Sequence, residues 1–200
     1  MKPKPILALI VVSVLLCSCH RKKVNSFNNA VAPKKGTFGY DLDFLRKRDT
    51  VVVLQDSSGA AEVVVSAKYQ GKVFTSTANG DTGKSFGWIN YKAFSAGINE
   101  HMNAYGGEDR LCLGPEGSRF ALFFKPGRKM ELANWHTPAP FDHERWAVVS
   151  KNDTQVVLDK SMHLQNYAGT ILDIKVERSI TLLSAGDIQK LLNIRPDRTV

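Results

Sequence analysis

The sequence predicts an all-β protein, an antiparallel β-sandwich that ends in a short helix. From residue 50 onward the chain contains many short runs that are apolar or alternate apolar with polar residues, and Gly, Pro, Asn or Asp bounds each run. Short strands separated by turn signals at close spacing are typical of two packed antiparallel sheets. Only the segment after Leu183 has the spacing of an amphipathic helix. We find no internal repeat, and the length fits one domain after an N-terminal leader.

The first residues predict export and lipidation. Lys2 and Lys4 precede an apolar run from Ile6 to Leu16, which has the size of a signal-peptide core and is too short for a bilayer-spanning helix of about 20 residues. The residues LCSC, which end at Cys19, resemble the lipobox of bacterial lipoproteins. We therefore expect a signal peptide over residues 1–18 and acyl chains on Cys19 that anchor the protein in the lipid bilayer. The alternatives are an ordinary signal peptide and an uncleaved anchor.

A basic tether is expected to follow, over residues 19–36. It contains the clusters HRKK and KK among Asn, Ser and Pro residues, a composition typical of flexible linkers. The formal net charge of +8 falls to +6 when Lys2 and Lys4 are removed. A tether that passes close to anionic head groups explains this charge. We expect a cell-envelope location at the outer membrane, and no nucleic-acid partner, because no pattern of basic and aromatic residues supports one.

Cysteine usage excludes an intramolecular disulfide in the domain expected over residues 37–200. Cys17 leaves with the signal peptide and Cys19 carries lipid, so Cys112 is the remaining thiol. The domain must therefore be stabilised by a hydrophobic core. Because Cys112 stands between two leucines, we expect it to be buried and unreactive.

The elements are expected in the following order. The segment GYDLDFLRKRD (39–49) predicts a short helix or turn that packs on the sheet. A strand TVVVLQ follows, and then two runs joined at Gly71, EVVVSAKYQ and KVFTSTA, predict a hairpin. Further strands are expected at FGWINYKAF, RFALFFKPG, RWAVVS, TQVVLD and MHLQNY.

The last strand and the helix have the clearest patterns. Apolar and polar residues alternate through TILDIKVERSITLLS, with a slip in phase between Arg178 and Ile180 that predicts a β-bulge. Ser184 is the expected helix cap, with Asp187 three residues later. An apolar stripe follows at Ile188, Leu191 and Leu192.

One candidate site is the segment NEHMNAYGGEDRLCLGPEG (99–117), which is rich in charges and glycines. The glycines allow tight turns and close approach of the backbone to a ligand. Arg110 offers a planar fork of donors for a carboxylate or for sugar hydroxyls. The alternative is a charged turn in which Arg110 pairs with Glu108 or Glu116 at the sheet surface.

A second candidate is ELANWHTPAPFDHERW (131–146). Trp135 and Trp146 are aromatic plates suited to stacking on a sugar ring, and His136 can move a proton near neutral pH. A role of both tryptophans in the core fits their residue type equally well. We expect no metal and no cofactor, because no HxH, HExxH or CxxC spacing occurs. No GxSxG motif marks a nucleophile.

The segments GGEDRLCLGPEG and NWHTPAP resemble a family of uncharacterised lipoproteins of Gram-negative bacteria that are similar to galactose-mutarotase-like proteins. The likeness runs from about Gly36 to the end of the chain. It implies a large antiparallel β supersandwich with a sugar cleft on its concave face. Members of this group are about twice as long, so the chain resembles an N-terminal half that lacks the late glutamate base of mutarotases. Cys112 and Ser118 depart from the pattern, which has an aromatic residue and a glycine there.

The resemblance implies a membrane-anchored carbohydrate-binding domain. Its expected site residues are Arg110, Glu116, Glu108, His101, Trp135 and His136. One alternative is an aldose 1-epimerase-like enzyme, in which His101 or His136 works with Glu116 as an acid–base pair. Another is a truncated fragment without function. A half sandwich also has open sheet edges, which predict self-association.

Overall fold

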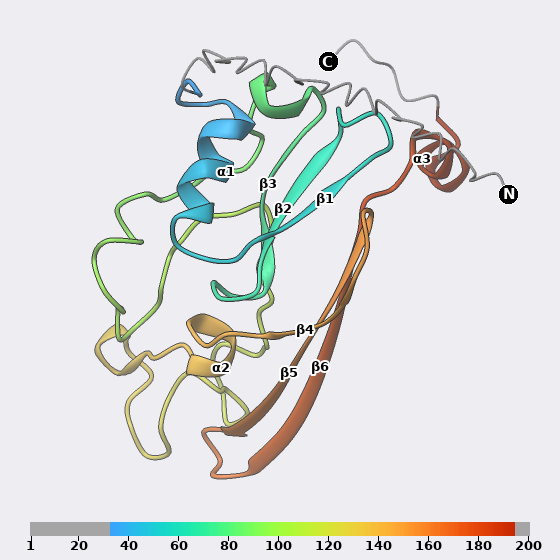
Figure 1. Ribbon diagram of the computed structural model, residues 1–200. Helices are drawn as coiled ribbons and strands as arrows, with labels where there is room; N and C mark the ends of the chain where they lie inside the picture. The colour runs from blue at the N-terminus through green and yellow to red at the C-terminus, as the bar shows by residue number, and fades with distance from the viewer. Residues whose placement is uncertain (1–32, 195–200) are drawn as a thin grey trace, which may run out of the picture. The chain divides into compact units, whose positions relative to one another are not determined.

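A computed structural model describes residues 33–194 of the chain. The chain divides into two compact units, residues 1–31 and 32–200, and every described residue belongs to the second unit. The expected signal peptide, Cys19 and nearly all of the expected tether therefore lie outside the described residues. Figure 1 shows the elements of the second unit in chain order.

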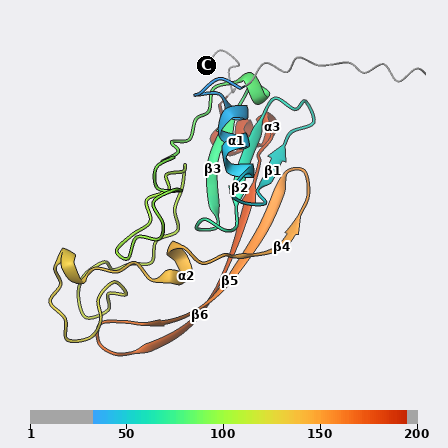
Figure 2. The same cartoon turned by 60° about the vertical axis from the view of Figure 1, so that its left-hand side comes forward.

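The second unit is mostly β, with two antiparallel three-stranded sheets and a few short helices. Each sheet follows chain order, β1-β2-β3 in the first and β4-β5-β6 in the second. Their strands are β1 (Val52–Gln55), β2 (Glu62–Ser66), β3 (Lys72–Thr77), β4 (Ala147–Lys151), β5 (Gln155–Gln165) and β6 (Ile171–Thr181). In Figure 2, β5 and β6 form a long curved hairpin that extends beyond the first sheet on the side of α2 (Ala139–Asp142).

The expected N-terminal and C-terminal helices are both confirmed. Helix α1 (Phe38–Arg46) buries one face, and its Phe38, Leu42 and Leu45 side chains join Val64 and Phe74 of the first sheet in a hydrophobic cluster. Toward the C-terminus of the described residues, α3 (Ala185–Leu192) begins with the capping box that the sequence predicts. Two short 3-10 helices, η1 (Gly80–Thr82) and η2 (Leu132–Asn134), lie in the connections.

The main hydrophobic cluster contains side chains of both sheets. Val52 and Leu54 of β1 share it with Val156 and Leu158 of β5 and with the fully buried Trp146. This arrangement joins the sheets through one core.

The predicted hairpin at Gly71 is confirmed, since β2 and β3 pair in antiparallel register on either side of this residue. Gly71 has a φ of 53°, and a Cβ there would lie 2.7 Å from Cδ2 of Trp146. Only glycine fits this conformation and this close contact.

Two predicted strands are wrong. Neither FGWINYKAF nor RFALFFKPG forms a named strand, although Ile89 makes an isolated bridge to Gly106. Their apolar side chains are buried without a ladder, Ile89 in the cluster below α1 and Phe123 and Phe124 in the main core. The runs TQVVLD and MHLQNY, expected as separate strands, belong to the single 11-residue strand β5.

The predicted bulge in β6 is also wrong. Pairing with β5 is unbroken from Gln155↔Thr181 to Gln165↔Ile171. The apolar alternation slips because Arg178 occupies an inward position of an otherwise regular strand. Its Nη1 donates to the carbonyl oxygen of Gly71 at 2.8 Å. A polar side chain with a specific partner, rather than an extra residue, accounts for the slip.

Candidate functional site

Two of the predicted site residues, His101 and His136, lie with their rings stacked. The ring centroids are 5.2 Å apart and the ring planes differ by 23°. A backbone bond holds the two segments together, because Thr137 N donates to His101 O at 2.8 Å, and a second bond from His136 N to Phe123 O at 2.9 Å ties His136 to the core. We call His101 and His136 the histidine pair.

Hydrogen bonding fixes which nitrogen of each ring carries a proton. Nδ1 of His101 lies 2.6 Å from the carbonyl oxygen of Trp135, and Nδ1 of His136 lies 2.9 Å from that of Glu100. Because a carbonyl oxygen only accepts, each Nδ1 must donate, and a neutral ring then keeps a free lone pair on Nε2. Oε1 of Glu100 is 3.7 Å from Nε2 of His101. Each ring can therefore accept a hydrogen bond or act as a base at Nε2.

Trp135 positions the histidine pair and is itself packed against the core. Its ring stacks on Phe123 with centroids 4.4 Å apart, and Phe124 meets it edge-on at 5.5 Å. One face of the indole is thus already covered. The Trp135 backbone contributes more directly to the site, because its carbonyl oxygen holds His101 in place.

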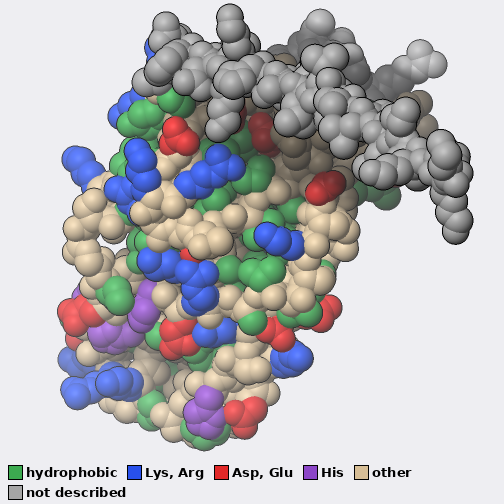
Figure 3. All heavy atoms as spheres, viewed as in Figure 1, with side chains coloured by type: hydrophobic (Ala, Val, Ile, Leu, Met, Phe, Trp, Pro, Cys, Tyr) green, Lys and Arg blue, Asp and Glu red, His purple; other side chains and the backbone are tan. Residues whose placement is uncertain are grey.

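A cavity of about 210 Å³ adjoins the histidine pair and is lined by Lys125, Arg128, Asn134 and His136. We call it the basic pocket. Asn134 is held by a hydrogen bond of 3.0 Å from its Nδ2 to the carbonyl oxygen of Lys129. Figure 3 shows histidine side chains beside a group of Lys and Arg side chains on the left of the face shown.

Arg110 lies in a different group of charges, where its partner is Asp142 at the end of α2. Nη2 of Arg110 is 2.9 Å from Oδ1 of Asp142, whose side chain is only 2% exposed. The same carboxylate accepts from Nε2 of Gln70 at 3.0 Å and from Nδ2 of Asn103 at 2.6 Å. Asp142 thus binds three segments that are distant in the sequence.

Lys72 is buried beside this carboxylate and is 2% exposed. Its Nζ donates to Oε1 of Gln70 at 2.7 Å and to the carbonyl oxygen of Gly106. Burial lowers the pKa of Lys72 to about 8, and the positive charge of Arg110 acts in the same direction.

Asp109 and Arg178 complete the group. Oδ1 of Asp109 accepts from the backbone N of Val73 at 2.8 Å, and its Oδ2 pairs with Nη2 of Arg178. We call Lys72, Asp109, Arg110, Asp142 and Arg178 the ionic cluster. Because its carboxylates and most of its donors are paired, the cluster fastens residues 103–110 to both sheets. An exception is Nε of Arg110, which is buried without a hydrogen-bond partner.

The remaining predicted site residues lie outside both groups. Oε1 of Glu108 accepts from Oγ of Ser76 at 2.7 Å on β3. Glu116 is exposed and has no hydrogen bond or ion pair within residues 33–194. The charged-turn alternative required Arg110 to pair with Glu108 or Glu116. Arg110 pairs with neither, so this alternative is wrong. Cys112 is exposed, so its expected burial is wrong.

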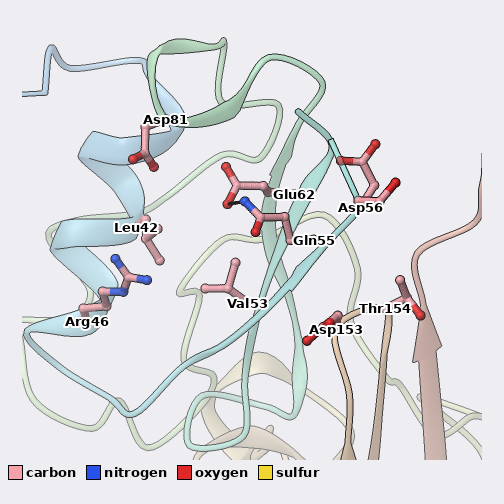
Figure 4. Close-up of a pocket in the computed structure, with 10 residues that line it drawn as sticks. Leu42, Arg46, Val53, Gln55, Asp56, Glu62, Asp81, Asp153 and Thr154 are labelled. Carbon is pink, nitrogen blue, oxygen red and sulfur yellow. Dashed lines mark hydrogen bonds between the residues drawn. The ribbon is translucent and has the colours of Figure 1, made fainter. Parts of the chain in front are cut away.

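A larger cavity, of about 480 Å³, lies on the side of α1 and the first sheet. In Figure 4, Leu42 and Arg46 face it from α1 and Asp153 and Thr154 from the turn before β5. We call it the acidic cleft, because four carboxylates line it. These belong to Asp56, Glu62, Asp81 and Asp153.

The carboxylates of the acidic cleft have contrasting environments. Burial raises the pKa of Glu62, and the nearby charge of Asp81 raises it further. A hydrogen bond from Ser58 holds the pKa of Asp56 below its usual value. Oε1 of Glu62 also accepts from Nε2 of Gln55 at 3.0 Å.

Two further kinds of feature are absent from residues 33–194. No group of three or more His, Cys, Asp or Glu side chains is arranged to hold a metal ion. No helix in this part of the chain is long and apolar enough to cross a membrane.

Several residues of these groups were not expected from the sequence. No pattern in the sequence marks Lys72 or Asp142. Arg178 did leave a signal, the break in the alternation of β6, which a bulge seemed to explain. The cations Lys125 and Arg128 look like ordinary turn residues in the sequence.

Residues 36–200 match the model of a family of unknown function, DUF6786, and the chain belongs to this family. Neither a curated protein nor a solved structure matches the chain.

Proposed function

We propose that this chain is a lipoprotein of the cell envelope whose β-rich domain binds a carbohydrate at the histidine pair. The LCSC segment at Cys19 and the basic residues that follow it support the lipid anchor. The likeness of GGEDRLCLGPEG and NWHTPAP to mutarotase-like lipoproteins supports a sugar as the ligand. We also infer a β-sandwich, because side chains of both sheets share the main hydrophobic cluster.

The observation that carries the proposal is the fixed protonation of the histidine pair. Both Nδ1 atoms donate to carbonyl oxygens, so Nε2 of each neutral ring is an acceptor, and His136 lines a cavity. Sugar hydroxyls donate as well as accept, and neighbouring hydroxyls of a ring require acceptors of fixed direction. Two stacked imidazoles meet this requirement, and Asn134 adds a polar group in the adjoining wall.

The test is calorimetry of the full chain in detergent micelles with monosaccharides and uronic acids. His136→Asn is the sharpest variant, because an Asn amide retains a donor for the Glu100 carbonyl and removes Nε2. We expect a three- to tenfold loss of affinity, since a net hydrogen bond contributes about 0.5–1.5 kcal/mol. His101→Asn should act similarly.

His163→Asn is the matched control. His163 is an exposed histidine of β5 that pairs with Asp173, and its replacement should leave the affinity unchanged. If no sugar binds to a cooperatively folded protein, or if His136→Asn binds as well as the wild type, the proposal is wrong.

A second candidate is an epimerase that acts at the anomeric carbon. The pairing of Nε2 of His101 with Oε1 of Glu100, 3.7 Å apart, favours it, because it brings a potential base next to a carboxyl group. The mutarotation of freshly dissolved α-glucose or α-galactose, followed by optical rotation, is the test. A rate equal to that of buffer alone would exclude this candidate.

We further propose that the domain associates with itself through β6. Within residues 33–194, β6 pairs with β5 on one side only, and an unpaired edge strand favours association. Analytical ultracentrifugation at several concentrations tests this, and a monomer at all of them would contradict it. The remaining alternative is a non-functional fragment, which should show no cooperative transition in a thermal melt. All the proposals above require a cooperative transition.

A further inference from the structure

The basic pocket contains two cations that the rest of the described chain leaves without a partner. Within residues 33–194, no carboxylate oxygen lies within 4.0 Å of Lys125 or Arg128, and neither side chain makes a hydrogen bond. Some other cations of the domain are paired, for example Arg145 with Asp49 at 2.5 Å and Lys160 with Glu144 at 2.7 Å. The charge of the pocket is therefore available to a ligand.

A tight turn places both cations in the pocket wall. Arg128 N donates to Lys125 O at 3.2 Å, and Gly127 between them has a φ of 75°. The hydroxyl of Tyr167 donates to the carbonyl oxygen of Arg128 at 2.9 Å, which ties the turn to the tip of the β5–β6 hairpin. The backbone that carries the two cations is thus held in place.

One acidic side chain touches the lining of the pocket. Oε1 of Glu131 accepts from Nδ2 of Asn134 at 3.4 Å. Glu131 is exposed and offsets one of the two positive charges. The basic pocket therefore remains positive even when His136 is neutral.

We propose that the basic pocket binds an oxyanion, the carboxylate or sulfate group of an acidic sugar, whose ring hydroxyls reach the histidine pair. This inference rests on the proposed function and narrows its ligand class. The guanidinium of Arg128 suits the paired oxygens of either group, and Lys125 supplies a point charge. The cavity of about 210 Å³ has room for such a group together with part of the ring.

Calorimetry of the full chain in micelles at low ionic strength tests the inference. The probes are glucose and galactose, their uronates, their 6-sulfates and inorganic sulfate. We expect at least one acidic sugar to bind tenfold or more tightly than its neutral parent, with an affinity that falls as NaCl is added. The stronger of the uronate and the sulfate identifies the oxyanion.

Arg128→Gln and Lys125→Gln remove the charges one at a time. Each should lower the affinity for the acidic sugar about tenfold and leave that for the neutral sugar unchanged. Lys151→Gln, which removes an exposed charge from β4, is the matched control and should change neither.

The outcomes separate this inference from the proposed function. If neutral and acidic sugars bind equally, or if Arg128→Gln has no effect, the oxyanion assignment is wrong and carbohydrate binding stands. If inorganic sulfate binds as tightly as the sugar sulfate, the acidic-sugar assignment is wrong. If no sugar binds, both are wrong.

Discussion

The acidic cleft and the basic pocket differ in charge and in the partners of their charged side chains. In the acidic cleft, Asp56 serves the fold, since its Oδ1 accepts from the backbone N of Ala60 at 3.1 Å and of Ala61 at 3.2 Å. In the basic pocket, Lys125 and Arg128 have no partner within residues 33–194. The acidic cleft is the larger cavity, but the basic pocket is the better candidate site.

The largest expected effect comes from Asp142, whose carboxylate holds Gln70, Asn103 and Arg110 together. Asp142→Ala leaves Arg110 without its carboxylate and removes one of the two acceptors of Gln70 Nε2 and of Asn103 Nδ2. We expect a loss of about 3–5 kcal/mol in the free energy of unfolding, measured by urea titration. Asp173→Ala, at an exposed site on β6, should change it by less than about 0.5 kcal/mol. A loss below about 1 kcal/mol for Asp142→Ala would show that contacts other than those with Asp142 hold residues 103–110 in place.

The second effect is a pH dependence of stability that arises from the buried amine of Lys72 and not from the exposed cations of the basic pocket. The pKa of Lys72 is about 8 in the folded protein and 10.5 without the fold. Between these values the unfolded chain binds more protons, so stability should rise with pH, by at most about 3 kcal/mol. Burial raises the pKa of Tyr105, which reverses the slope above pH 10. Urea titrations at pH 8 and 9.5 measure the effect, and Lys72→Met should abolish it.

The third effect tests the structural role of the acidic cleft. Asp56→Asn weakens the acceptor for two backbone N–H groups, so the melting temperature at pH 7 should fall by a few degrees. Because the pKa of Asp56 is lowered, this stabilisation is present above its unfolded pKa and disappears as pH falls through the folded value. Wild type and variant should therefore melt alike in strong acid. Asp43→Asn, at an exposed position of α1, is the control. If the melting temperature falls equally in both variants, Asp56 does not stabilise the fold through these two bonds.

The smallest expected effect is at the basic pocket. Arg128→Gln removes a charge that stabilises nothing in the described part of the chain, so the free energy of unfolding should change by less than about 0.5 kcal/mol. Urea titration without ligand measures it. A loss above about 1 kcal/mol would indicate that Arg128 has a structural partner, and the contrast between the two cavities would not hold.

The sequence predicted correctly those elements that depend on residues close to one another in the chain. The cap at Ser184, the glycine at position 71 and the apolar face of α1 each depend on residues within a few positions, and all three are confirmed. The segment RFALFFKPG has strand-like residues but no strand. Its apolar side chains reach the main core from an irregular backbone, which residue type alone does not reveal.

The candidate site was predictable in part. Trp135 and His136 were expected from their chemistry and His101 from the family resemblance, and the structure brings them together. Asp142 was not expected, because its value as an acceptor depends on donors that fold toward it from positions as distant as Gln70. Pairings across such separations leave no pattern in a single sequence.

The ionic cluster also sets an order of events in folding. Arg178 is 107 residues from its partner Gly71 and 69 residues from Asp109. During synthesis, Gly71 and Asp109 are both made before β6. Asp109 therefore has no ion pair with Arg178 until the last strand has been synthesised. Contacts of such long sequence separation form slowly. The charged interior around Asp109 therefore remains incomplete while the 69 residues up to Arg178 are added.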